Sequence, residues 1–125
     1  MQQDVLGIIT REPLGVVGAI TPWNYPMENI SWKIAPALAS GNTLILKPAE
    51  ESSLSAIYVA QLAIEAGIPD GVLNVVPGIG DISGKALALH PDVDGIFFTG
   101  STYTGKKIMQ YSGQSNLKRV ALECG

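Results

Sequence analysis

Short apolar runs recur along the chain and alternate with longer segments in which apolar residues are spaced as on one face of a helix. The runs cover residues 16–20, 43–46, 72–76, 95–99 and 119–122. Near-continuous apolar runs of this length are typical of strands that are buried on both faces, as in parallel sheets. The pattern therefore predicts five strands of one parallel sheet.

The clearest helical segment covers residues 53–66, where Leu54, Ile57 and Tyr58 begin a spacing of three and four residues. Helices are also expected over residues 27–39, 82–89 and 102–111. Ser52 or Ser53 offers an N-cap, and the expected helix-ending glycines are Gly41, Gly67 and Gly113. Strands alternating with helices predict an α/β fold, an open parallel sheet with helices on both faces.

Composition narrows the class of protein. The chain has 125 residues, of which 46% are hydrophobic and 15% charged, so it is expected to form one folded domain. The net charge is −3 and no basic cluster is present, so nucleic acid is not an expected partner.

The single cysteine, Cys124, and the single histidine, His90, exclude an internal disulfide and make a structural metal site improbable. A reducing cytoplasm is therefore the expected location. No apolar run is long enough to cross a membrane, and the first residues lack the pattern of a signal peptide, so we expect no membrane partner.

Ligands of open parallel sheets bind at the carboxyl ends of the strands, so the residues that follow each run are the candidates for function. The first run is followed by a turn, Thr21-Pro22-Trp23-Asn24-Tyr25-Pro26. The Asn24 amide could donate a hydrogen bond to a developing oxyanion, or it could only shape the turn. Trp23 could equally be a core aromatic residue.

Lys47 and Glu50 follow the second run, three residues apart. A carboxylate here can accept hydrogen bonds from both hydroxyls of a ribose, and a lysine can bind the same sugar or a phosphate. The alternative is a solvated charge pair, with Glu50 favoured by the dipole of the following helix.

Glycines follow the third and fourth runs. The segment Gly78-Ile79-Gly80-Asp81-Ile82-Ser83-Gly84 misses the usual dinucleotide-binding pattern by one residue. After the fourth run, Gly100 permits close approach of a ligand and Ser101 begins a helix, where exposed N–H groups favour an anion. Ser101 could also be a plain N-cap.

The last run delivers Glu123 and Cys124. Neighbours on a strand point to opposite faces, so Glu123 is not expected to reach the Cys124 sulfur. Cys124 is interpreted as a small core residue and His90 as a residue facing the dipole at a helix end.

In this order and spacing, the motifs at the strand ends resemble those of the NAD(P)-dependent aldehyde dehydrogenase superfamily over nearly the whole chain. The matching segments are Glu12-Pro13-Leu14-Gly15-Val16 with Pro22-Trp23-Asn24-Tyr25-Pro26, Leu46-Lys47-Pro48-Ala49-Glu50, Gly67-Ile68-Pro69 with Gly71-Val72-Leu73-Asn74, Phe98-Thr99-Gly100-Ser101, and Leu122-Glu123 with Gly125. The resemblance implies a partial, Rossmann-like cofactor domain over residues 1–125, with residues 1–15 as a possible hairpin arm.

The resemblance also implies roles for single residues. Asn24 would be the side-chain donor of the oxyanion hole and Glu123 the general base. The cofactor-binding residues would be Ile20 and Trp23 along the nicotinamide path, Lys47 and Glu50 at the adenosine ribose, Gly100 and Ser101 at the pyrophosphate, and Gly80 within the loop that borders the adenine. The cofactor would be NAD, with NADP possible, because Glu50 would repel a 2′-phosphate.

By the same resemblance, the enzyme would be an oxidoreductase that oxidises an aldehyde to a carboxylic acid through a thiohemiacetal and a thioester. The nucleophilic cysteine of the family lies in a Gly-Gln-x-Cys segment beyond Glu123, which this sequence does not contain, and Cys124 is not that residue. We therefore expect an internal fragment that is inactive alone, from an enzyme that acts as a homo-oligomer.

Three further expectations complete the interpretation. Asp81 stands where the family often has proline, and Thr104 stands where it has an aliphatic residue, so the adenine pocket would be more polar than usual. The alternative function is a short, non-catalytic protein that binds a nucleotide or a partner chain.

Overall fold

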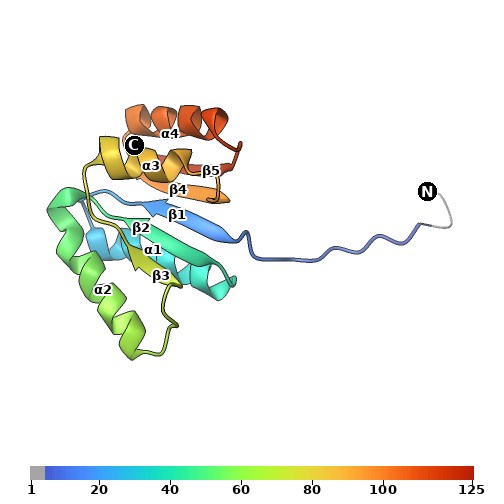
Figure 1. The fold of residues 1–125 in the computed structure, drawn as a ribbon, viewed down its shortest axis with the longest axis horizontal. Coiled ribbons are helices and arrows are strands. Elements are labelled where there is room, and N and C mark those ends of the chain that lie inside the picture. Colours follow the sequence, from blue (N-terminus) through green and yellow to red (C-terminus); the bar gives the residue numbers. More distant parts are fainter. Residues whose placement is uncertain (1–4) are drawn as a thin grey trace.

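The computed structural model describes residues 5–125, which form one five-stranded sheet covered by helices (Figure 1). The strands are β1 (Val16–Ile20), β2 (Thr43–Lys47), β3 (Leu73–Val75), β4 (Gly95–Gly100) and β5 (Arg119–Cys124). All neighbouring strands are parallel, in the spatial order β3-β2-β1-β4-β5. The predicted α/β sheet is confirmed.

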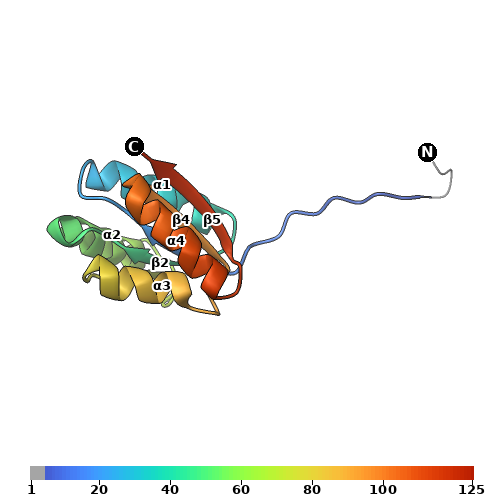
Figure 2. The ribbon, with the colours of Figure 1, turned by 90° about the horizontal axis from the view of Figure 1, so that it is seen from above.

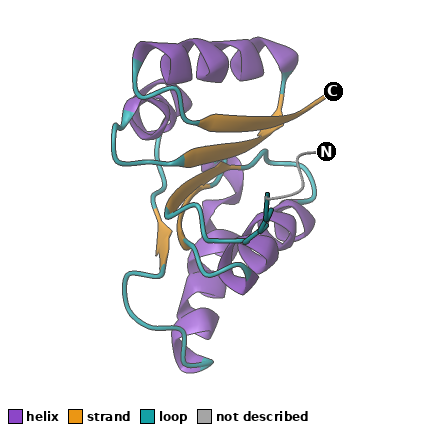
Figure 3. Ribbon diagram, turned by 90° about the vertical axis from the view of Figure 1, so that its right-hand side faces the viewer, coloured by secondary structure: helices purple, strands orange, loops and turns teal. Residues whose placement is uncertain are grey.

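Helices cover both faces of the sheet, as the view in Figure 3 shows. Helices α1 (Pro26–Ala39) and α2 (Ser53–Glu65) pack on one face. Helices α3 (Lys85–Leu89) and α4 (Thr102–Gln114) lie side by side over the other face (Figure 2). A 3-10 turn, η1 (Glu50–Ser52), precedes α2, and a π-helical turn, η2 (Gly80–Gly84), precedes α3.

Two apolar clusters hold these layers together. Ile30 and Ala56 pack with Leu44 and Leu46 on the α1/α2 face, and Ile96 and Ile108 belong to the cluster on the α3/α4 face. Because both faces are buried, the strands need no alternation of polar residues, which is why they read as continuous apolar runs.

The chain changes direction between β1 and β4. From β1, the chain adds β2 and then β3 on one side of the sheet. It then crosses back, so that β4 pairs with the other edge of β1 and β5 pairs with β4. Connections leaving β1 and β4 therefore diverge to opposite faces, which opens a crevice at the carboxyl ends of these strands. The strand order thus fixes where a ligand can enter.

Helix ends differ from the sequence prediction at two places. Gly113 lies inside α4, which continues to Gln114, and the chain then reverses with Leu117 in a left-handed conformation at φ 57°. Ser52 occupies the predicted N-cap position of α2, but its side chain makes no capping hydrogen bond. The Ser53 hydroxyl donates to the Ala49 carbonyl oxygen at 3.0 Å. The predicted endings at Gly41 and Gly67 are confirmed, with positive φ at both.

The expected hairpin arm stays a prediction. Residues 5–14 form no helix or strand and extend away from the sheet (Figure 1). The first four residues of the expected arm lie outside the described part of the chain.

Candidate functional site

A hollow with a volume of about 490 Å³ lies at the carboxyl ends of β1, β4 and β5. We call it the strand-end hollow, and its lining residues are Pro22, Trp23, Asn24, Thr99, Gly100, Ser101, Glu123, Cys124 and Gly125. The parallel register pairs Thr99 with Glu123, which brings two segments far apart in the sequence to the same edge. Five of the nine candidate residues therefore line one cavity.

Asn24 is held in this hollow by the turn after β1. Tyr25 adopts the left-handed conformation at φ 48°, and α1 begins directly after it at Pro26. The buried amide of Asn29 donates to the carbonyl oxygens of Asn24, at 2.9 Å, and Tyr25, at 3.2 Å. The exposed Asn24 side chain therefore projects from a turn whose backbone is held by hydrogen bonds from Asn29.

Two neighbours hold the Glu123 carboxylate. The Thr99 hydroxyl donates to Glu123 Oε2 at 3.0 Å, and the Lys33 ammonium of α1 lies 3.5 Å from the same oxygen. Lys33 is 13% exposed in its side chain and Glu123 is 56% exposed, so the carboxylate is anchored on the protein side and open to the hollow.

Cys124 lies on the opposite face of β5 from Glu123. Its sulfur approaches Gly105 of α4, at 2.8 Å from where a Cβ would stand. The expectation that the two side chains point apart is therefore confirmed. Cys124 is exposed, so its interpretation as a buried core residue is wrong: β5 is the edge strand of the sheet, and within the described residues no further strand covers it.

Ser101 is the N-cap of α4. Its hydroxyl oxygen accepts a hydrogen bond from the Thr104 backbone N–H at 3.2 Å. Beside it, Gly100 has a φ of +159°, and a Cβ at this position would meet the Phe98 ring at 2.6 Å. Residues 101–103 are all exposed, so the start of α4 is open to solvent where it borders the hollow.

A second polar group lies beyond the end of β2. The Lys47 ammonium donates to Glu50 Oε2 at 3.3 Å, and the Gly80 backbone N–H donates to Glu50 Oε1 at 2.8 Å. Lys47 is only 4% exposed, whereas the Glu50 side chain is 46% exposed, so the ammonium is buried and the carboxylate is the solvated half of the pair. The aliphatic part of the Lys47 side chain is covered by the protein, and its ammonium group is directed at Glu50.

These contacts set the ionisation of Glu50. Burial is the largest single influence and favours the neutral acid. The hydrogen bonds from its own N–H and from Gly80, together with the Lys47 charge, outweigh burial and lower the pKa of Glu50 below its ordinary value of 4.5. The carboxylate is therefore ionised at neutral pH.

A cleft of about 320 Å³ opens between η2, α3 and α4, and we call it the α3/α4 cleft. Its walls are Ile20, Ile79, Gly80, Asp81, Gly84, Lys85, Tyr103, Thr104, Lys107, Ile108 and Tyr111. Ile20 lines this cleft and not the strand-end hollow with Trp23, because its side chain points to the α3/α4 face. Gly80 joins the cleft to Glu50 through its N–H.

Sequence reasoning missed Lys33 and Asn29. Both lie on α1, away from the segments that directly follow strands. A signal was present, because Asn29 and Lys33 are four residues apart and so lie on one face of the helix, next to the buried Ile30. Two polar residues bordering an apolar helical stripe indicate a polar neighbour across the interface.

Two other classes of site were examined within residues 5–125. No three His, Cys, Asp or Glu side chains lie close enough together there to hold a metal ion. No helix in that range has the length and apolar character needed to cross a membrane.

The sequence and the fold are both similar to those of known proteins. The model of the Aldehyde dehydrogenase family matches residues 1–125. NADP/NAD-dependent aldehyde dehydrogenase PuuC from Escherichia coli is 59% identical over 120 residues, which are 96% of this chain and 24% of PuuC. Aminoacetaldehyde dehydrogenase from Pseudomonas aeruginosa is 56% identical over the same shares of the two chains.

Solved structures agree with these relatives. An indole-3-acetaldehyde dehydrogenase complexed with NAD+ superposes with a TM-score of 0.92 at 63% identity, covering 93% of this chain and 23% of that one. A gamma-glutamyl-gamma-aminobutyraldehyde dehydrogenase from Burkholderia cenocepacia gives 0.91 at 66% identity, with the same coverage. The chain thus spans about a quarter of the length of its relatives. Over its whole sequence, it belongs to the aldehyde dehydrogenase family.

Proposed function

We propose that this chain is the cofactor-binding segment of a longer enzyme, an NAD-dependent oxidoreductase that converts an aldehyde to a carboxylic acid. One observation carries the proposal. Asn24, Glu123, Gly100 and Ser101 line a single hollow at the point where the strand order reverses. An amide donor, a carboxylate base and an exposed helix start are the groups that such a reaction requires.

The donor set beyond β2 fits the adenosine ribose of a dinucleotide. Glu50 uses one lone pair of each oxygen for Lys47 and Gly80, so the remaining lone pairs can accept from two neighbouring hydroxyls. The same negative charge would repel a 2′-phosphate, which favours NAD over NADP. The backbone at Gly100 and Ser101 would take the pyrophosphate, and Trp23 would border the nicotinamide.

When bound, NAD+ supplies the acceptor for the hydride that leaves the substrate carbon. The nucleophilic thiolate would come from the Gly-Gln-x-Cys segment that the family carries beyond Glu123. Its attack on the aldehyde carbon forms a C–S bond and places negative charge on oxygen, where the Asn24 amide would donate. This adduct is a thiohemiacetal, and loss of the hydride from its carbon would convert it to a thioester. Water would then cleave the thioester, releasing the carboxylic acid and the thiolate, and Glu123 would accept the proton of that water.

Lys33 and Thr99 have a defined part in this scheme. Both contact the same oxygen, Oε2, of Glu123 and leave Oε1 free to face the hollow. They would hold the carboxylate in one orientation, with its free oxygen placed to accept a proton. The substrate would be a small-molecule aldehyde, and the complete enzyme is proposed to be a homo-oligomer, like the family at large.

The proposal is tested by measuring NADH formation from a panel of aldehydes with the complete protein. Glu123→Gln should lower kcat by about a hundredfold or more, because the amide cannot accept the proton. Glu65→Gln, at the exposed end of α2, is the matched control and should leave kcat unchanged.

Two results would contradict the proposal. NAD+ binding without any aldehyde oxidation by the complete protein would favour the alternative, a non-catalytic nucleotide-binding protein. An unchanged kcat in Glu123→Gln would remove the base from the mechanism.

A further inference from the structure

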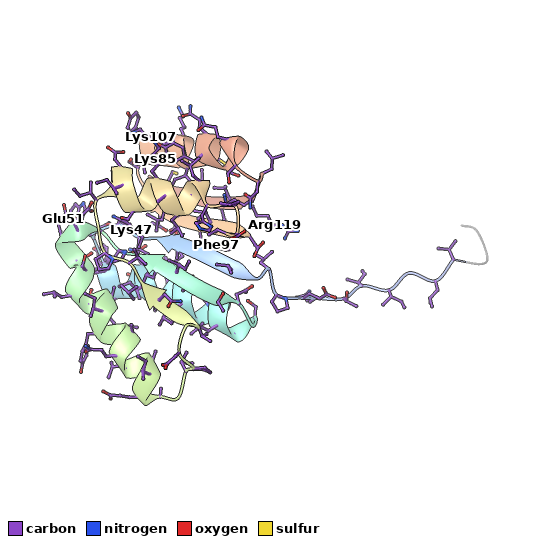
Figure 4. All side chains as sticks on the ribbon, in the orientation of Figure 1. Lys47, Glu51, Lys85, Phe97, Lys107 and Arg119 are labelled. Atoms are coloured by element: carbon purple, nitrogen blue, oxygen red, sulfur yellow. The ribbon has the colours of Figure 1, made fainter. Side chains whose placement is uncertain are left out.

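An ion pair bridges the two walls of the α3/α4 cleft. The Lys107 ammonium of α4 donates to Asp81 Oδ1 of η2 at 3.4 Å, and both residues line the cleft. The Asp81 side chain is 81% exposed and that of Lys107 is 34% exposed, so the pair lies at the rim and not on the floor. Figure 4 shows Lys107 and Lys85 on the side of the molecule where the strands end.

Apart from this ion pair and Lys85, the larger side chains that line the cleft are apolar or aromatic. Ile20, Ile79 and Ile108 form its walls together with Tyr103 and Tyr111. Lys107 also lies over the Tyr103 ring, 4.9 Å from its centre. A flat heterocycle with a polar edge fits such a site, because its faces meet apolar groups and its edge meets the charged rim.

The position of the cleft indicates which heterocycle this is. Gly80 donates its N–H to Glu50 and is followed directly by Asp81. A ribose held by Glu50 would therefore have its base in the cleft, beside Asp81. This step rests on the proposed function, in which Glu50 holds the adenosine ribose of NAD.

We propose that Asp81 and Lys107 select adenine as the base of the dinucleotide by reading its polar edge. The Asp81 carboxylate accepts from the 6-amino group, and the Lys107 ammonium donates to N1. The two side chains come from opposite walls, so their order along the edge is set by the fold. Contact with Asp81 raises the pKa of Lys107, which keeps its ammonium charged at neutral pH.

Hypoxanthine presents the reverse pattern, with an acceptor oxygen at C6 and a hydrogen on N1. In the same pose, it would put an oxygen against the carboxylate and an N–H against the ammonium. Its size, shape and stacking faces are otherwise those of adenine. A difference in affinity between the two bases therefore measures recognition of the polar edge, because both bases fit the cleft equally well in size and shape.

The test is a pair of calorimetric titrations of the complete protein, with NAD+ and with nicotinamide hypoxanthine dinucleotide. The unmodified protein should bind NAD+ about five- to tenfold more tightly, the effect expected for exposed hydrogen bonds to charged groups. Asp81→Ala and Lys107→Met should each bring the two affinities to within about twofold of one another. Lys106→Met removes the same charge from a neighbouring position of α4 outside the cleft and should preserve the preference.

The outcomes separate this inference from the proposed function. Equal affinity of the unmodified protein for both dinucleotides, or an unchanged preference in Lys107→Met, would overturn the reading of the base edge while leaving NAD binding intact. Failure of both dinucleotides to bind the folded complete protein would overturn the proposed function, and this inference with it.

Discussion

Glu50 connects three parts of the chain through one carboxylate. It begins η1, accepts from Lys47 at the end of β2, and accepts from Gly80 in the turn before α3. Its side chain is 46% exposed, so these contacts orient the carboxylate without closing it off from a ligand. A residue that is both anchored and accessible is suited to binding.

Glu50→Gln removes the charge while keeping one acceptor and adding donors. NAD binding to the complete protein should weaken by about ten- to a hundredfold, and NADP binding should hold or improve, because charged hydrogen bonds contribute about 1.5–3 kcal/mol. Lys47→Met should weaken both cofactors. Binding titrations with NAD+ and NADP+ measure these effects.

Glu51→Gln is the matched control, since Glu51 is the exposed neighbour labelled in Figure 4 and should leave both affinities unchanged. Unchanged affinity for NAD in Glu50→Gln would mean that Glu50 has no part in holding the ribose.

The lowered pKa of Glu50 also predicts a dependence of stability on pH. Because the folded-state pKa lies below 4.5, ionised Glu50 stabilises the fold above that pH, and this contribution is lost as pH falls through the folded value. The Tm difference between the unmodified chain and Glu50→Gln should be constant near neutral pH and shrink in acid. A difference that instead grew on acidification would contradict the direction of the shift.

Asn29 is expected to position Asn24. Asn29→Leu leaves the carbonyl oxygens of Asn24 and Tyr25 without their donor, so the turn should loosen and the free energy of unfolding should fall by about 1–3 kcal/mol. In the complete protein, kcat should fall more than affinity for NAD. Asn74→Leu removes a comparable bond to the Gly71 carbonyl oxygen, far from the hollow, and should leave kcat unchanged.

At the scale of elements, the close approach of α3 to β1 depends on Gly18. A Cβ at this position would lie 2.5 Å from Ile96 Cδ1 and 3.0 Å from Leu87 Cγ. Both neighbours belong to the buried cluster on the α3/α4 face, where they have little room to move. Any larger residue here would therefore force Ile96 and Leu87 to shift within the buried cluster.

Gly18→Ala should lower the free energy of unfolding by about 1–3 kcal/mol, the usual effect of overpacking a core. Gly113→Ala is the matched control, because nothing lies within 4 Å of its Cβ position inside α4. It should raise stability by about 0.5–1 kcal/mol through helix propensity. Urea unfolding of both variants measures the contrast, and equal effects of the two changes would show that the contact at Gly18 is not restrictive.

At the scale of the whole molecule, the chain supplies a carboxylate and an amide but no thiolate on their side of the sheet. Within residues 5–125 the one cysteine is Cys124, and its sulfur lies on the face of β5 that meets α4. Glu123 and Asn24 line the hollow, which Cys124 also borders, but the Cys124 sulfur is directed at Gly105 of α4. The strand geometry, not sequence distance, keeps these groups apart.

The isolated chain should therefore oxidise no aldehyde. Mixing it with NAD+ and excess aldehyde should produce no NADH, even in stoichiometric amount, because no thiolate can form the thiohemiacetal beside Asn24. The appearance of NADH, abolished by Cys124→Ser, would identify Cys124 as a nucleophile and contradict this assignment.

The sequence alone determined the sheet, its helices and the strand ends at which the candidate site residues lie. These depend on local periodicity and on strands buried on both faces, and both are visible in short windows. The general positions of Asn24, Glu50, Ser101 and Glu123 followed, because each directly succeeds or ends an apolar run.

Only the tertiary structure decided which of these residues meet. The reversal of strand order at β1 and β4 brings Asn24 and Glu123 into one hollow and sends Ile20 to another cleft. Lys33 reaches Glu123, and Lys107 reaches Asp81, across separations that no local pattern records. Such contacts arise from the packing of layers, and packing depends on residues distant in the sequence, so the chain's own order of residues does not reveal them.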